Sequence, residues 1–183
     1  RAWHDARLQC EGLGGYLVCL ESEEEQQFVS RLAIKTLKID NALTAGTDIG
    51  PVVDERQLAG NLKYVEIAGK EGGTVFGGER LERAAKGFYQ RPALVTNTTA
   101  EMTINREEVF GPVASVVRVK DYAEALAMAN DTEFGLSSGI CTTSLKYATH
   151  FKQHAQAGMV MVNLPTAGVD YHVPFGGRKG SSY

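Results

Sequence analysis

The sequence lacks the long apolar run, the basic excess and the cysteine framework that mark several classes of protein. It contains no stretch of 18 or more apolar residues, so the chain is not expected to span a membrane. Nineteen Lys and Arg residues stand against 22 Asp and Glu residues, and this net charge of −3 gives no electrostatic reason to expect a nucleic-acid partner. Cys10, Cys19 and Cys141 form no Cys-x-x-Cys pair or disulfide framework, which favours a reducing, cytoplasmic location.

The common catalytic and nucleotide-binding signatures are also absent. The nearest approach to a dinucleotide fingerprint, Gly12-Leu13-Gly14, has Leu17 where the last glycine should stand. The chain has no Walker A sequence, no Gly-x-Ser-x-Gly elbow and no His-Glu-x-x-His helix. His150 and His154 are four residues apart and could hold a metal ion. Because no carboxylate ligand is near them in sequence, a solvated helix face is favoured and no metal site is predicted.

The length and the ends of the chain suggest part of something larger. At 183 residues and 43% hydrophobic content, the chain can form one domain, or one domain with a small appendage, without disulfide or metal staples. It starts at Arg1 with neither a starting Met nor a signal peptide, and it stops at Tyr183 in a loop-like context. We therefore expect a piece of a longer protein.

Hydrophobic periodicity predicts an α/β fold with a mostly parallel sheet flanked by helices. After Gly111-Pro112, strands and helices alternate with short connections, which is typical of parallel β-α-β units. Asp54 is expected to cap a long helix, since its carboxylate can accept from the first-turn amides. The expected helices cover residues 3–11, 22–38, 54–69, 121–130 and 144–157, and the expected strands cover residues 16–20, 74–76, 93–95, 113–119, 139–141 and 159–162.

Two segments stand out chemically. In Glu107–Val113, Glu108 and Phe110 would point to the same side of an extended backbone, where they could grip a ribose hydroxyl and cover a flat ring. From the spacing alone, a solvated acid beside a core phenylalanine is favoured over that site. In Pro174–Gly180, the glycines permit close backbone approach and the basic pair could meet an anion; a polar surface loop is the alternative.

These two segments, together with Glu133–Gly139 and Met161–Asn163, resemble in order and spacing the C-terminal half of the catalytic domain of the aldehyde dehydrogenase superfamily. Upstream, Gly46–Pro51 is similar to the family's Thr-Asp-x-Gly-Pro loop. The resemblance runs from about Thr36 to Tyr183.

Finer details resemble one branch of that family. Ile104-Asn105-Arg106 and Val169–Val173 look like the corresponding segments of 2-oxoglutarate semialdehyde dehydrogenases. The resemblance therefore implies an enzyme that oxidises a semialdehyde to a carboxylate.

The family resemblance implies a mechanism and a cofactor. A cysteine thiolate attacks the aldehyde, the thiohemiacetal gives hydride to NAD or NADP, and a Glu-activated water hydrolyses the thioester. By position in the motifs, Glu108 would bind the nicotinamide ribose and Phe110 would lie against the nicotinamide. Val169, Asp170 and Phe175 would lie near the aldehyde pocket.

Several parts of the family's enzyme have no match in this sequence. The nucleotide-binding domain, the oxyanion-stabilising Asn, the general-base Glu and the C-terminal arm that pairs strands between subunits are not found. We therefore expect an aldehyde dehydrogenase fragment that is inactive and binds no cofactor by itself. The alternative is a non-enzymatic interaction or oligomerisation module, in which exposed sheet edges pair copies of the chain.

The first 35 residues fit the family less cleanly. Leu8-Gln9-Cys10 occupies the place of the family's Gly-Gln-x-Cys segment, so Cys10 is one candidate nucleophile. The same region more closely resembles the opening of a C-type lectin-like domain, which would make Cys10 a disulfide half. The lectin sugar motifs Glu-Pro-Asn and Trp-Asn-Asp are absent, so calcium-dependent sugar binding is not expected. We expect residues 1–35 to form a helix–strand–helix appendage and residues 36–183 to form the dehydrogenase fragment.

Overall fold

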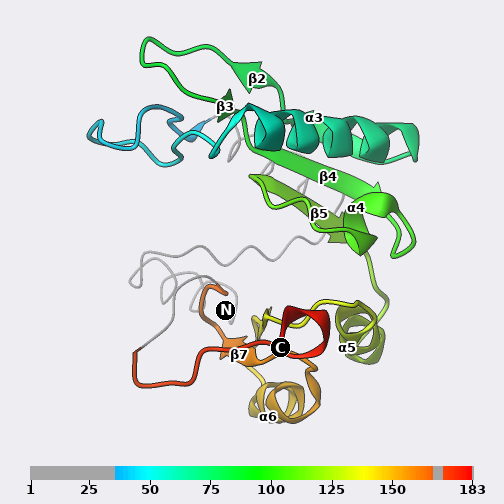
Figure 1. Ribbon diagram of the computed structural model, residues 1–183. Coiled ribbons are helices and arrows are strands. Elements are labelled where there is room, and N and C mark those ends of the chain that lie inside the picture. Colours follow the sequence, from blue (N-terminus) through cyan, green and yellow to red (C-terminus); the bar gives the residue numbers. More distant parts are fainter. Residues whose placement is uncertain (1–35, 167–170, 183) are drawn as a thin grey trace. The chain divides into compact units, whose positions relative to one another are not determined.

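The computed structural model describes residues 36–166 and 171–182 (Figure 1). The elements expected within residues 1–35 lie outside the described residues. The chain divides into two compact units. Within the described residues, the first unit covers residues 36–118 and the second unit covers residues 119–166 and 171–182.

The first unit is organised around helix α3 (Glu55–Lys70). Asp54 caps it as expected, since its Oδ1 accepts from the backbone N–H of Gln57 at 2.7 Å. Glu55 in the first turn and Lys70 in the last turn have the signs that the helix dipole favours. The predicted helix over residues 54–69 is therefore confirmed to within a residue at each end.

A three-stranded sheet packs against α3 (Figure 1). Its order is β1 (Thr74–Gly77), β4 (Ala93–Thr98) and β5 (Val113–Val117), with β1 antiparallel and β5 parallel to β4. The short helix α4 (Thr103–Arg106) lies in the crossover from β4 to β5. The core of this unit contains three buried residues from α3, β4 and α4, namely Ala68, Val95 and Ile104.

A small hairpin completes the first unit. It pairs β2 (Arg80–Leu81) with β3 (Tyr89–Gln90) in antiparallel register. The side chains of Tyr89 and Gln90 are almost fully buried. This hairpin brings a polar residue, Gln90, into the interior beside α3, where it contacts Asn61.

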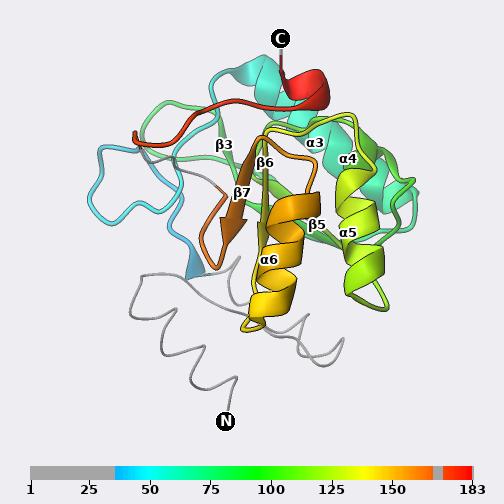
Figure 2. The same ribbon diagram turned by 90° about the horizontal axis from the view of Figure 1, so that it is seen from below.

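The second unit contains a parallel pair of strands and two helices (Figure 2). Strands β6 (Ser137–Ile140) and β7 (Met159–Val162) are joined through α6 (Leu145–His154), which is the expected β-α-β arrangement. Helix α5 (Tyr122–Asn130) precedes them, and a 3₁₀ turn, η1 (Lys179–Ser181), follows.

The parallel pairings β4·β5 and β6·β7 confirm the predicted α/β class. The single alternating run expected after Gly111 is instead divided, because β5 belongs to the three-stranded sheet and β6 to the two-stranded sheet. Helix α6 ends at His154 rather than at residue 157, since Ala155 leaves the helical conformation. None of the described helices is long and apolar enough to cross a membrane.

Candidate functional site

The first unit contains an open pocket of about 600 Å³ between α3 and the segment Glu107–Pro112. This volume falls within the range of small-molecule sites. Glu108 and Phe110, the two residues that the family resemblance points to, are both among those that line this pocket. Its full lining is Asp54, Arg56, Gln57, Gly60, Tyr64, Glu108, Val109 and Phe110.

Phe110 differs from the sequence expectation in its backbone conformation. The same-side argument for Glu108 and Phe110 assumes an extended backbone, but Phe110 has φ +53°. That part of the prediction is therefore wrong, because strand alternation does not apply at a left-handed residue. The competing interpretation of a core phenylalanine is also wrong, since Phe110 is 75% exposed. Its ring is presented to solvent at the edge of the pocket.

Glu108 is exposed and has no hydrogen-bond or ion-pair partner among the described residues. Its neighbour Glu107 is engaged instead, because the Tyr64 hydroxyl donates to Glu107 Oε2 at 2.7 Å. This hydrogen bond is the main cause of a raised pKa at Tyr64, with burial and the negative charge of Glu107 adding to it. The two adjacent acids thus have different roles: Glu107 fastens the segment to α3, and Glu108 remains available to a ligand.

A chain of side-chain amides lies beneath the pocket. Gln57 Nε2 donates to the Val109 carbonyl oxygen at 3.0 Å and to Asn61 Oδ1 at 2.7 Å. Asn61 Nδ2 donates to Gln90 Oε1 at 3.0 Å, and Gln90 Nε2 donates to the Gly78 carbonyl oxygen at 3.3 Å. With the Asn61 amide turned over, its nitrogen donates to the Val109 carbonyl oxygen at 3.1 Å. In both orientations Asn61 lies at the centre of this amide chain.

Sequence reasoning did not find this amide chain. Gln57, Asn61 and Tyr64 recur at helical spacing on α3, and polar residues at these positions could have signalled a polar face turned towards another segment. Gln90 carries no such signal, because it reaches Asn61 only through the fold, from 29 residues away.

The remaining predicted site residues lie elsewhere. Cys10, Val169 and Asp170 are outside the described residues. Phe175 belongs to the second unit and is exposed. The nucleophile and the aldehyde pocket therefore stay predictions.

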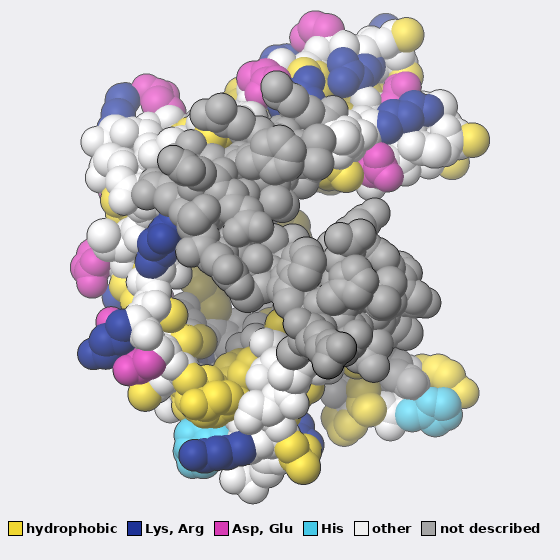
Figure 3. All heavy atoms as spheres, turned by 180° about the vertical axis from the view of Figure 1, so that it is seen from behind, with side chains coloured by type: hydrophobic (Ala, Val, Ile, Leu, Met, Phe, Trp, Pro, Cys, Tyr) yellow, Lys and Arg dark blue, Asp and Glu magenta, His cyan; other side chains and the backbone are white. Residues whose placement is uncertain are grey.

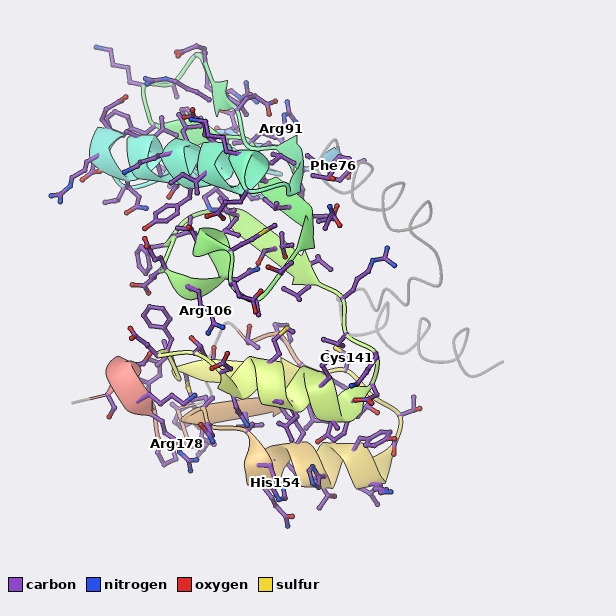
Figure 4. The ribbon with its side chains drawn as sticks, turned by 90° about the vertical axis from the view of Figure 1, so that its right-hand side faces the viewer. Phe76, Arg91, Arg106, Cys141, His154 and Arg178 are labelled. Carbon is purple, nitrogen blue, oxygen red and sulfur yellow. The ribbon has the colours of Figure 1, made fainter. Side chains whose placement is uncertain are left out.

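The Pro174–Gly180 segment does show the expected close backbone approach. A Cβ atom added at Gly158 would lie 1.9 Å from the carbonyl oxygen of Gly176, so only glycine fits there. Lys179 is not free to meet an anion, because its Nζ donates to the carbonyl oxygens of Asn130 and Thr132 at 2.6 and 3.1 Å. Arg178 precedes η1 in the same segment (Figure 4).

The two histidines of α6 do not form a chelating pair. His154 projects from the end of the helix (Figure 4), and its ring stacks on that of His150 with centroids 3.9 Å apart and planes 9° apart. An ion bound by both rings would have to lie in both ring planes, and nearly parallel planes do not meet close to the rings. The Tyr122 hydroxyl contacts His150 Nδ1 at 2.9 Å. This geometry favours the solvated helix face.

Comparison with known proteins identifies the class. The model of the aldehyde dehydrogenase family matches residues 15–183, and the chain belongs to this family. The match reaches into the first 35 residues, because it begins at residue 15.

Among curated relatives, the chain is similar to the alpha-ketoglutaric semialdehyde dehydrogenase of Bacillus subtilis, with 38% identity over 90% of this chain and 35% of the relative. It is also similar to the alpha-ketoglutarate semialdehyde dehydrogenase of Haloferax volcanii, with 39% identity over 85% of this chain and 33% of the relative. The chain thus spans about a third of the length of these relatives.

A solved structure with the same fold is the betaine aldehyde dehydrogenase of Staphylococcus aureus in complex with NAD+. The TM-score is 0.81 and the identity 29%, over 87% of this chain and 32% of that chain. The aldehyde dehydrogenase of Bacillus cereus (E194S mutant) gives a TM-score of 0.80 at 33% identity, over 86% of this chain and 32% of that chain. The partial aldehyde dehydrogenase α/β fold that the sequence predicts is confirmed.

Proposed function

We propose that this chain forms part of an NAD(P)+-dependent aldehyde dehydrogenase that oxidises a semialdehyde similar to 2-oxoglutarate semialdehyde. The names of the Bacillus subtilis and Haloferax volcanii relatives support this substrate class. The Staphylococcus aureus neighbour holds NAD+, which supports the cofactor. The proposed location is the cytoplasm, in keeping with the cysteine usage.

The single observation that carries the proposal is the pocket that brings Glu108 and Phe110 together. The free carboxylate of Glu108 can accept hydrogen bonds from ribose hydroxyls, and the exposed ring of Phe110 can lie against a flat nicotinamide. When bound, the cofactor supplies the hydride acceptor. In this proposal Glu108 and Phe110 bind and orient its nicotinamide end, Val169, Asp170 and Phe175 lie near the aldehyde pocket, and Cys10 is the candidate nucleophile.

Because the chain spans about a third of its relatives, we propose that other parts of the family's fold complete this pocket. The chain by itself is then inactive and binds no cofactor. Turnover by the 183-residue chain with a semialdehyde and NAD+ or NADP+, lost in Cys10→Ala, would overturn this part of the proposal.

The second candidate is an interaction or oligomerisation module. One observation favours it: most of the exposed large hydrophobic side chains in the described residues belong to the second unit. In Figure 3, yellow hydrophobic side chains lie beside the cyan histidines, and the described histidines all belong to this unit. Concentration-dependent self-association without any contribution to cofactor use would support this alternative.

A chimaera tests the proposed enzyme. In it, this chain replaces the matched region of the Bacillus subtilis relative, and NAD(P)H formation is followed with the semialdehyde. We expect turnover, and we expect Glu108→Gln to raise the KM for the cofactor about tenfold, since a charge-assisted hydrogen bond contributes about 1.5–3 kcal/mol. The matched control is Glu82→Gln, an exposed acid on the same unit away from the pocket. A folded chimaera with equal cofactor KM in both variants would contradict the role of Glu108.

A further inference from the structure

We propose that Asn61 is a positioning residue. Its buried carboxamide holds the segment Glu107–Gly111 in the conformation that lines the pocket. Asn61 itself is not among the residues that line the pocket, so it would act through the segment rather than by touching a ligand. The consequence for cofactor affinity rests on the proposed function, whereas the structural role does not.

The first observation is the burial and the bonding of Asn61. Its side chain is fully buried, yet it is bonded on both sides, to Gln57 of α3 and to Gln90 of β3. Among the described residues, no buried side-chain nitrogen or oxygen lacks a partner. A buried amide whose hydrogen bonds are all made favours one arrangement of its neighbours. Moving a neighbour would leave a buried polar group without a partner, which costs free energy.

The second observation is the contact with Gly111. A Cβ atom added at Gly111 would lie 2.3, 2.4 and 2.5 Å from the Nδ2, Cγ and Oδ1 atoms of Asn61. No side chain fits at such distances, so the backbone of Gly111 rests directly on the carboxamide. This contact comes immediately after Phe110, the residue with φ +53°.

Together, these contacts hold the segment at two positions, Val109 and Gly111, on either side of Phe110. Gln57 holds the Val109 carbonyl oxygen while it bonds Asn61, and the face of the Asn61 amide supports Gly111. Positive φ at a bulky residue is costly and persists only where its surroundings over-determine it. Asn61 lies at the centre of those surroundings.

Hydrogen exchange of the 183-residue chain without cofactor tests this role. The reporters are the amides of Val113 and Ala93, which donate to the carbonyl oxygens of Gly111 and Pro112 at 2.7 and 2.8 Å. In Asn61→Leu, a substitution of similar size without hydrogen bonds, we expect these two amides to exchange about tenfold faster, because the segment that accepts their hydrogen bonds is released. The amides of β1 should keep their rates. Unchanged exchange at Val113 and Ala93 would overturn the proposal.

A double-mutant cycle tests the same contact by changing Gly111 instead of Asn61. It replaces the first experiment if Asn61→Leu fails to fold. Gly111→Ala should also speed exchange at Val113 and Ala93, because the added methyl group pushes the segment away from the Asn61 carboxamide. In an Asn61→Ala background, the same Gly111→Ala change should have little further effect, since the colliding group is gone. The control is Gly69→Ala on α3, where an added Cβ would have its nearest neighbour at 3.8 Å. Additive effects would overturn the proposal.

Steady-state kinetics of the chimaera separate this inference from the proposed function. Asn61→Leu should raise the KM for NAD+ about fivefold or more and change kcat less, since the segment must be ordered before the cofactor binds. If Glu108→Gln leaves the cofactor KM unchanged while Asn61→Leu still accelerates exchange, the cofactor role fails and the positioning role stands. If Glu108→Gln raises KM and Asn61→Leu changes neither KM nor exchange, Asn61 is not a positioning residue.

Discussion

The described parts of the two units differ in the number and polarity of their buried residues. The described part of the first unit buries apolar residues together with four polar ones, Asn61, Gln90, Thr96 and Thr98. The described part of the second unit has fewer buried apolar residues and no buried polar ones, and its helix α5 has no buried residue. Most of the exposed large hydrophobic side chains also belong to the second unit.

This difference suggests that the first unit is built to hold a site and the second unit to present a contact surface. A polar interior holds backbone segments in one arrangement, which suits a site that depends on an uncommon conformation at Phe110. The exposed apolar side chains in the described part of the second unit suit a surface that another part of the protein or a partner covers.

The largest effect is expected from the core of the first unit. Leu58 is completely buried, so Leu58→Ala should cost about 2–5 kcal/mol of unfolding free energy. Leu145 is 82% exposed in the second unit, and Leu145→Ala should change stability by no more than about 0.5 kcal/mol. Urea denaturation measures both. Equal losses of unfolding free energy in the two variants would contradict the contrast between a buried Leu58 and an exposed Leu145.

The next effect concerns Gly158, where the described part of the second unit leaves no room for a side chain. Gly158→Ala would bring a methyl group against the Gly176 carbonyl oxygen and should cost about 1–3 kcal/mol by overpacking. Gly69→Ala in the first unit meets no such obstacle and serves as the control. A Gly158→Ala chain as stable as the unsubstituted protein in thermal denaturation would contradict the close approach in this unit.

A smaller effect is expected at the helix caps of the second unit. Asp121 Oδ1 accepts from Glu124 N at 2.9 Å, and Asp121→Ala should cost about 1 kcal/mol. Ser144 Oγ accepts from Tyr147 N at the longer distance of 3.4 Å, so Ser144→Ala should cost less. Urea denaturation of the two variants ranks them, and the reverse order would show that the cap distances do not report cap strength.

The smallest effect is pH-dependent. The Glu107 contact raises the pKa of Tyr64 above its ordinary value of 10.0, so the protonated tyrosine stabilises the folded state below pH 10 and this contribution is lost as the pH rises through the folded-state pKa. Tyr64→Phe should therefore be slightly less stable than the unsubstituted chain near neutral pH, and the difference should shrink at alkaline pH. Denaturation at a series of pH values measures this, and a difference that grows with pH would contradict the assignment.

Much of the fold follows from local patterns. Asp54 and the apolar spacing after it predict α3, and the alternation after Gly111-Pro112 predicts the parallel pair of β6 and β7. The parallel pair of β4 and β5 was not predicted, because its crossover contains the four-residue helix α4, which is too short to show a helical period. The hairpin of β2 and β3 could not be predicted, because two-residue strands carry no periodicity.

The candidate site was predictable in part. The resemblance to the family indicates Glu108 and Phe110, and both residues line the pocket, while their role toward a cofactor stays a prediction. Their geometry was not predictable, because the conformation at Phe110 depends on support from Asn61, which is distant in sequence. Gln90 likewise reaches this network only through tertiary packing.

The most direct test of the central claim is hydrogen exchange of the chimaera with and without NAD+. The proposed pocket predicts slower exchange in residues 54–64 and 107–111 when NAD+ is present, because a bound ligand suppresses local opening. Glu108→Gln should reduce this protection at the same NAD+ concentration, and Glu82→Gln should preserve it. Binding of NAD+ without protection of either segment would contradict the claim that Glu108 and Phe110 form the nicotinamide end of a cofactor site.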